Sequence, residues 1–128
     1  MSVKFVGFHL MPYQDLPKDF EENYRSMHVT VPKSLYNPEK GHQMYHDFLD
    51  ELEYMVDFGF DGVGVNEHHS CAYGMMPSPN LMASILARKV RESNTALVVL
   101  GNSIALYNPP IRIAEEGAML DVLSGGRL

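Results

Sequence analysis

The sequence predicts an α/β fold with a parallel sheet, and three features of the chain support this prediction. Apolar and amphipathic segments alternate in the order strand, helix, strand, helix, strand, helix, which is typical of α/β proteins. The expected strands are apolar throughout, as parallel strands are when helices cover both sheet faces or the sheet closes into a barrel. Polar residues gather directly after the strand ends, where such folds bind their ligands.

Three short segments rich in β-branched and aromatic residues are expected to form buried strands. They span residues 3–10, 60–65 and 96–100. Residues 11–41 follow the first strand and combine little periodicity with four prolines, so we expect a long loop there with a short helix at 19–27. A loop of this length inside a compact domain is usually functional or else marks an error in the assignment of the elements.

Apolar residues repeat at helical spacing in three other segments. The first helix carries its apolar face at Tyr45, Phe48, Leu49, Leu52, Met55 and Val56, and Gly59 ends it. The second presents Met82, Ile85, Leu86 and Val90. The third opens with Pro109-Pro110, because proline fits a first helical turn, and ends at Gly125-Gly126. Its inner stripe is expected at Ile111, Ala114, Ala118 and Val122.

Bulk composition restricts the possible functions. The 128 residues suffice for one domain, and a net charge of -6 disfavours binding to nucleic acid. The single cysteine, Cys71, cannot form an internal disulfide. No apolar run reaches the roughly 20 residues of a membrane span, and the N-terminus lacks a signal-peptide pattern. We therefore expect a soluble, cytoplasmic protein without a membrane partner.

The segment Asn66-Glu67-His68-His69 is the most informative part of the chain. Four hydrogen-bonding side chains follow an expected buried strand, and their desolvation is unfavourable unless they serve a site. Because neighbouring strand residues point to opposite faces, we expect Glu67 and His69 on one side and Asn66 and His68 on the other. An ordinary polar strand end is the alternative interpretation.

Metal binding and nucleophilic catalysis have weaker support. His42 and His46 have the i,i+4 spacing of helical metal ligands, but no glutamate follows the first histidine. We therefore predict that both are exposed helix residues and that the chain holds no metal. No Gly-x-Ser-x-Gly, Gly-x-Gly-x-x-Gly or P-loop pattern is present.

Two further segments allow a functional and a structural interpretation. Gly101 interrupts a strong strand pattern, which indicates the close approach of another group or a bulge. Asn102 beside it is suited to hydrogen-bond a planar heterocycle. Tyr73, Met75 and Met76 fit either the wall of an apolar pocket or the packing beneath a long loop.

Three ordered segments resemble the luciferase-like, flavin-dependent monooxygenases. The first is residues 59–69, which end in the Glu-His-His of positions 67–69; the second is residues 73–81. The third runs from Leu100-Gly101-Asn102 to Gly125-Gly126-Arg127. The resemblance covers residues 3–10 and 42–128, and the loop between them is less diagnostic.

This resemblance implies a (β/α)₈ TIM barrel, of which the chain has the first three βα units. It also implies a site for reduced FMN, or in some branches the deazaflavin F420, at the carboxyl ends of the strands. The implied partners are O₂, a small organic substrate and a separate flavin reductase. His68 matches the family's catalytic acid/base or intermediate stabiliser, supported by Glu67 and His69.

The other implied site residues surround the cofactor and the substrate. The expected cofactor-binding residues are Asn66, Glu67, His69, Gly101 and Asn102. Gly101-Asn102 matches a position where the family often has a non-prolyl cis peptide. The expected substrate-pocket residues are Met11, Tyr73 and Met76.

A (β/α)₈ barrel typically needs about 250 residues, and the family holds the flavin phosphate in later parts of the barrel. We therefore expect residues 1–128 to be the N-terminal part of a single barrel domain, truncated and weak in flavin binding. The alternatives are a non-catalytic flavin-binding or subunit-like protein, a half-barrel that assembles as a homo-oligomer, and a small open sheet of three strands.

Overall fold

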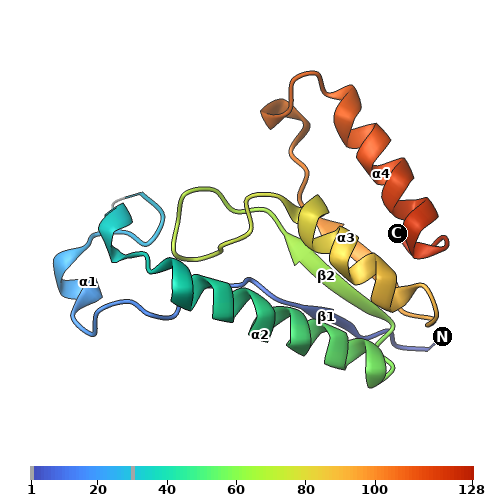
Figure 1. The fold of residues 1–128 in the computed structure, drawn as a ribbon, viewed down its shortest axis with the longest axis horizontal. Coiled ribbons are helices and arrows are strands. Elements are labelled where there is room, and N and C mark those ends of the chain that lie inside the picture. Colours follow the sequence, from blue (N-terminus) through green and yellow to red (C-terminus); the bar gives the residue numbers. More distant parts are fainter. Residues whose placement is uncertain (1, 30) are drawn as a thin grey trace.

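The computed structural model describes residues 2–29 and 31–128, and within them a parallel sheet has the strand order β1-β2-β3. Val6 pairs with Gly62, and Gly62 pairs in turn with Ala96. The elements are β1 (Val6–Phe8), α1 (Phe20–Asn23), the 3₁₀ helix η1 (Lys33–Leu35), α2 (Pro38–Asp57), β2 (Gly62–Asn66), α3 (Pro79–Val90), β3 (Ala96–Leu100), the 3₁₀ helix η2 (Ile104–Leu106) and α4 (Ile111–Ser124). The parallel sheet confirms the predicted α/β class (Figure 1).

Helix α2 begins earlier than its apolar face alone predicts. The side chain of Asn37 caps the helix by accepting hydrogen bonds from the N–H groups of Glu39 (2.9 Å) and Lys40 (3.2 Å). Pro38 occupies the first turn, where a missing N–H has no effect. The loop after β1 therefore ends before Pro38 and not at Gly41. The buried apolar face of α2 includes Phe48, Leu49, Leu52 and Val56.

Helices α2 and α3 cover one face of the sheet. Helix α2 packs against β1 and β2, α3 packs against β2 and β3, and the two helices contact each other (Figure 1). The core lies between this helix layer and the sheet, and its fully buried members include Leu52, Val63, Val65 and Leu86.

Strand β1 is shorter and more exposed than predicted. It spans Val6–Phe8 and not residues 3–10, and Val6 and Phe8 are 51% and 44% exposed. The side chains of Phe8 and Leu100 both lie close to Gly64. A Cβ added to Gly64 would be 3.5 Å from the Phe8 side chain and 3.3 Å from the Leu100 side chain. The prediction of full burial was wrong because α2 and α3 cover only the opposite sheet face.

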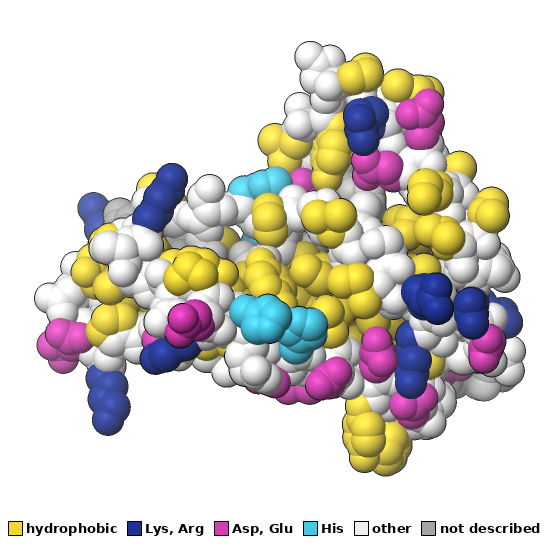
Figure 2. All heavy atoms as spheres, viewed as in Figure 1, with side chains coloured by type: hydrophobic (Ala, Val, Ile, Leu, Met, Phe, Trp, Pro, Cys, Tyr) yellow, Lys and Arg dark blue, Asp and Glu magenta, His cyan; other side chains and the backbone are white. Residues whose placement is uncertain are grey.

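The packed faces of α3 and α4 also differ from the predicted ones. Leu86 and Val90 of α3 are buried as expected, whereas Ile85 is 44% exposed. Helix α4 packs chiefly on α3 and buries Leu120 and Ser124. The four residues of its predicted inner stripe are exposed: Ile111, Ala114, Ala118 and Val122. Apolar residues occur on several sides of α4, so their periodicity did not identify the packed face. Figure 2 shows hydrophobic side chains exposed over α3 and α4.

The long loop after β1 is tied to the loop after β2. The N–H of Tyr13 donates to the carbonyl of Ala72 (2.9 Å), and the N–H of Met75 donates to the carbonyl of Met11 (2.8 Å). Helix α1 is shorter than the predicted helix at 19–27. The two loops meet at the carboxyl end of the sheet and form the walls of the candidate site.

Candidate active site

Four polar side chains at the end of β2 form two separate pairs. Nδ1 of His68 lies 2.6 Å from Oδ1 of Asn66, and Nε2 of His69 lies 2.8 Å from Oε1 of Glu67. Each pair joins residues two apart, because the extended backbone sends alternate side chains to the same side. The expected division of this segment into two faces is therefore observed.

Asn66 is the residue that holds His68. Its side chain is almost fully buried, and its Nδ2 donates to the carbonyl of His9 at 2.7 Å. Its backbone N–H points to the sulfur of Met76 at 3.3 Å. The sequence-based interpretation assigned support of His68 to Glu67 and His69. In the structure Glu67 and His69 instead bind each other.

Glu67 connects β2 to the segment that follows β3. Its side chain is 6% exposed, and its Oε2 accepts a hydrogen bond of 2.8 Å from the N–H of Ser103. Burial by itself raises the pKa of Glu67, but the hydrogen bonds from His69, Ser103 and Asn102 outweigh burial and hold that pKa below its ordinary value. Glu67 is therefore a carboxylate at neutral pH.

Gly101 is a glycine because Glu67 approaches its backbone. A Cβ added at this position would lie 2.6 Å from Cβ of Glu67 and 3.1 Å from its backbone nitrogen. Of the two interpretations of Gly101, close approach by another group is therefore the one observed. The approaching group belongs to the protein itself.

Asn102 turns the chain away from β3 with a left-handed backbone, at φ 69°. Its Nδ2 donates to Oδ1 of Asn80 at 2.7 Å, and Asn80 in turn donates to Glu116 at 2.7 Å. The expected cis peptide at Gly101-Asn102 is wrong. In the described residues the cis peptide bond is Asn108-Pro109, and the positive φ of Asn102 makes the turn.

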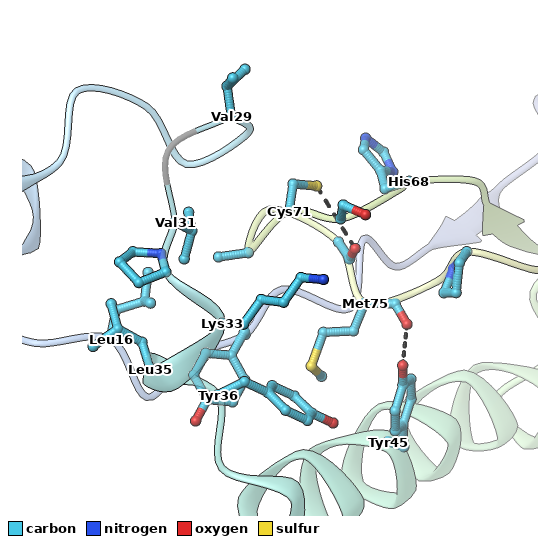
Figure 3. Close-up of a pocket in the computed structure, with 16 residues that line it drawn as sticks. Leu16, Val29, Val31, Lys33, Leu35, Tyr36, Tyr45, His68, Cys71 and Met75 are labelled. Carbon is cyan, nitrogen blue, oxygen red and sulfur yellow. Dashed lines mark hydrogen bonds between the residues drawn. The ribbon is translucent and has the colours of Figure 1, made fainter.

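His68 lies at the edge of a cavity of about 410 Å³ between the two loops (Figure 3). The hydroxyl of Tyr45 donates to the carbonyl of Met75 in its wall, and Tyr13 accepts a hydrogen bond from the N–H of Asn37 (2.9 Å). The cavity is lined mainly by apolar and aromatic side chains, among them Tyr13, Leu16, Val31, Leu35, Tyr36, Tyr45 and Met75, with Lys33 and Cys71 beside them. Such a lining with few polar groups is typical of small-molecule sites.

The residues expected at the substrate pocket lie in different places. Met11 and Met76 have no exposed surface and belong to the core, so neither presents a side chain to the cavity. Tyr73 is 38% exposed, and its ring contacts that of His68 with 5.2 Å between centroids. Met75 lines the cavity.

His68 and Asn102 occupy the same end of the sheet but face different hollows. Asn102 lines a second hollow of about 410 Å³ together with Asn80, Leu120 and residues of β3. The family resemblance assigns His68 and Asn102 to one flavin site, but in the structure the two side chains do not share a cavity. The reason is the turn at Asn102, which directs its amide to α3.

His9 is a site residue that sequence reasoning missed. Its Nδ1 accepts the N–H of Met11 at 2.8 Å, and its Nε2 lies 3.0 Å from Oε2 of Glu51. Its ring stacks on Phe48 with 4.4 Å between centroids. The available signal was a polar residue within the apolar segment predicted as strand 3–10; the structure ends β1 at Phe8, directly before His9.

Two other features of the described residues concern function. No group of three or more histidine, cysteine or carboxylate side chains in the part of the chain that the structure describes has a metal-binding arrangement. No helix within those residues has the length and apolar character needed to cross a bilayer. His42 and His46 are exposed on α2, as predicted.

Together, the fold and the site define a parallel α/β protein with a candidate small-molecule site at the carboxyl ends of its strands. The sequence profile of the luciferase-like monooxygenases matches residues 26–128. This match covers more than half of the chain, and the chain therefore belongs to that family.

Several curated proteins are similar to the chain. The y4wF protein of Sinorhizobium fredii is 37% identical over 70% of the chain and 26% of its own length. The 4-hydroxyprotoasukamycin monooxygenase of Streptomyces nodosus subsp. asukaensis is 32% identical over 62% of the chain and 20% of its own length. The oxygenase component of the flavin-dependent trigonelline monooxygenase of Acinetobacter baylyi is 29% identical over 67% of the chain and 23% of its own length.

The chain spans about a quarter or less of the length of these relatives. No solved structure matches it significantly. The family and the names of these relatives support flavin-dependent monooxygenase chemistry at the level of the family.

Proposed function

We propose that this chain forms part of a flavin-dependent monooxygenase with a (β/α)₈ barrel, which uses reduced FMN and O₂ to oxidise a small, largely apolar organic molecule. One observation carries the proposal. In a member of this family, His68 is held by a buried amide at the carboxyl end of a parallel sheet, beside an apolar cavity of about 410 Å³.

The residues around the cavity suit part of a flavin. A volume of about 410 Å³ lies within the ordinary range of small-molecule sites, and the tyrosine and aliphatic walls match a flat aromatic ring. Lys33 is the cation among the lining residues and is available to an anionic group of the bound molecule. A deazaflavin has a similar ring system, so this lining fits either cofactor.

When bound, reduced flavin would supply the activation of O₂. His68 would hold or move a proton at Nε2, because its Nδ1 is already bound to Asn66. The apolar walls around Tyr45 and Met75 would exclude water from the reacting groups. The printed name of the trigonelline relative, an oxygenase component, supports a separate reductase as the source of reduced flavin. We also propose a homo-oligomeric assembly.

Anaerobic titration of the isotope-labelled chain with reduced FMN, followed by NMR, tests the proposal. The expected result is saturable movement of the signals of His68 and of residues around Tyr45 and Met75. A His68→Ala variant should bind more weakly, whereas His42→Ala, at an exposed position on α2, should bind as the wild type does. Unmoved cavity signals in a folded chain, or equal binding by both variants, would contradict the assignment. Parallel titrations with oxidised FMN and a reduced deazaflavin identify the preferred cofactor.

A further inference from the structure

Asn66 forms hydrogen bonds whose directions are chemically fixed. The carbonyl oxygen of His9 has no hydrogen to donate, so the Asn66 atom that lies 2.7 Å from it must be the NH₂ group. The reverse orientation would place two oxygens in contact. The oxygen of the Asn66 amide is therefore the atom that faces Nδ1 of His68, at 2.6 Å.

This orientation determines which nitrogen of His68 carries the proton. An amide oxygen only accepts hydrogen bonds, so Nδ1 of His68 must be the donor. In the neutral ring Nε2 is then unprotonated, and no described residue forms a hydrogen bond with it. His69 has the opposite arrangement, because its Nε2 donates to the carboxylate of Glu67.

The parts that hold Asn66 are themselves fixed. Asn66 is 3% exposed. Its backbone N–H lies 3.3 Å from the sulfur of Met76, and the backbone N–H of His68 donates to the carbonyl of Met76 at 2.9 Å. The His9 ring is held by Met11 and Glu51. Asn66 therefore has no rotational freedom with which to offer its NH₂ group to His68.

We propose that Asn66 is a positioning residue that sets His68 in the Nδ1–H form, so that Nε2 accepts a hydrogen bond from an O–H or N–H group of the bound molecule. The ligand class selected at this point of the cavity is an aromatic or apolar molecule with such a donor. The assignment of this ligand class rests on the proposed function, whereas the assignment of the proton to Nδ1 of His68 does not.

The position of the proton is measurable in the wild-type chain without any cofactor. Long-range ¹H–¹⁵N correlation spectra at a pH well above the ordinary histidine pKa of about 6.5 distinguish the two neutral forms. We expect Nδ1–H for His68, and Nε2–H for His9 and His69. A wild-type His68 found in the Nε2–H form would overturn the proposal, whatever the variants do.

Two variants separate positioning from general structural damage. Asn66→Leu removes both side-chain hydrogen bonds while keeping the same branched arrangement of heavy atoms, and it should shift His68 towards the Nε2–H form that free histidine prefers. Glu67→Gln disturbs the neighbouring pair and should leave the form of His68 unchanged. The role of Asn66 would be contradicted if Glu67→Gln moved the proton of His68 to Nε2. It would also be contradicted if the proton stayed on Nδ1 in a folded Asn66→Leu chain.

Phenol and its methyl ether, anisole, are matched probes for the ligand class because they differ by one O–H. Anisole lacks the donor for Nε2 of the half-buried His68, so we expect phenol to bind about tenfold more tightly and to move the Nε2 signal of His68. This preference should disappear in Asn66→Leu. Equal affinities in the wild type would refute the ligand class. A chain that has the expected proton position but does not bind reduced FMN would refute only the proposed function.

Discussion

The carboxylate of Glu67 accepts a hydrogen bond of 2.8 Å from the backbone N–H of Ser103 and so joins the end of β2 to the segment after β3. The same carboxylate binds His69 on its other oxygen. Glu67 thus adds a side-chain connection between two strand ends that the sheet already pairs. Its loss should be measurable both in the stability of the chain and in the pH dependence of that stability.

Glu67→Gln should destabilise the chain by about 1–3 kcal/mol, the range expected when hydrogen bonds to a charged, buried group are weakened. Urea unfolding at neutral pH measures this change. The matched control is Glu92→Gln, because the side chain of Glu92 is 77% exposed and forms an ion pair with the neighbouring Arg91. The control should change stability by less than about 0.5 kcal/mol. Equal effects of the two substitutions would show that the Glu67 contacts do not stabilise the fold.

Acidification should remove the contribution of Glu67. Its hydrogen bonds hold its folded-state pKa below the ordinary value of 4.5 despite burial. A lowered pKa means that this stabilisation is fully present above pH 4.5 and disappears as the pH falls through the folded-state pKa. Urea midpoints of the wild type should therefore fall more steeply below pH 4.5 than those of Glu67→Gln. Parallel curves for the two proteins would contradict the assignment.

Gly101→Ala should destabilise the chain, because the added Cβ would lie 2.6 Å from Cβ of Glu67. Overpacking of this kind typically removes about 1–3 kcal/mol. Gly117→Ala is the matched control: Gly117 lies inside α4, and no atom approaches an added Cβ within 4 Å. Alanine there should stabilise the helix by about 0.5–1 kcal/mol. Thermal or urea unfolding should therefore give changes of opposite sign, and a stabilising Gly101→Ala would be inconsistent with the structure.

Asn37→Ala should destabilise α2 by about 0.5–2 kcal/mol, since the side chain of Asn37 satisfies the N–H groups of Glu39 and Lys40. Hydrogen exchange should accelerate first at these two amides. Asn94→Ala, at an exposed position before β3, is the control and should have little effect. Unchanged exchange at the start of α2 would refute the capping role.

Several elements were predictable because local backbone rules determine them. The order of strands and helices along the chain and the parallel sheet followed from alternating apolar and amphipathic segments. The glycines that end α2 and α4 have the left-handed backbone that the pattern predicted, with φ 81° at Gly59 and 70° at Gly125. The division of residues 66–69 into two faces followed from the alternation of side chains along a strand, whereas the hydrogen bonds within each face did not.

Other features depend on neighbours that the local pattern does not reveal. The apolar residues of α4 allowed more than one inner face, and contact with α3 selected Leu120 over Val122. The burial of β1 was overestimated because apolar character does not say whether a second layer covers the strand. Met76 looked like a pocket residue, but it packs beneath β2 and contacts the N–H of Asn66.

The sequence by itself determined the family, the order of strands and helices, and the placement of Asn66 and His68 on one side of a strand end. These properties depend on residue types and on short spacings along the chain. Only the tertiary structure decided that the His9 carbonyl, 57 positions from Asn66, orients the amide that binds His68. It also decided that Asn102 turns away to Asn80. The physical reason is that the direction of a hydrogen bond is set by its partner, and both partners come from distant elements of the fold.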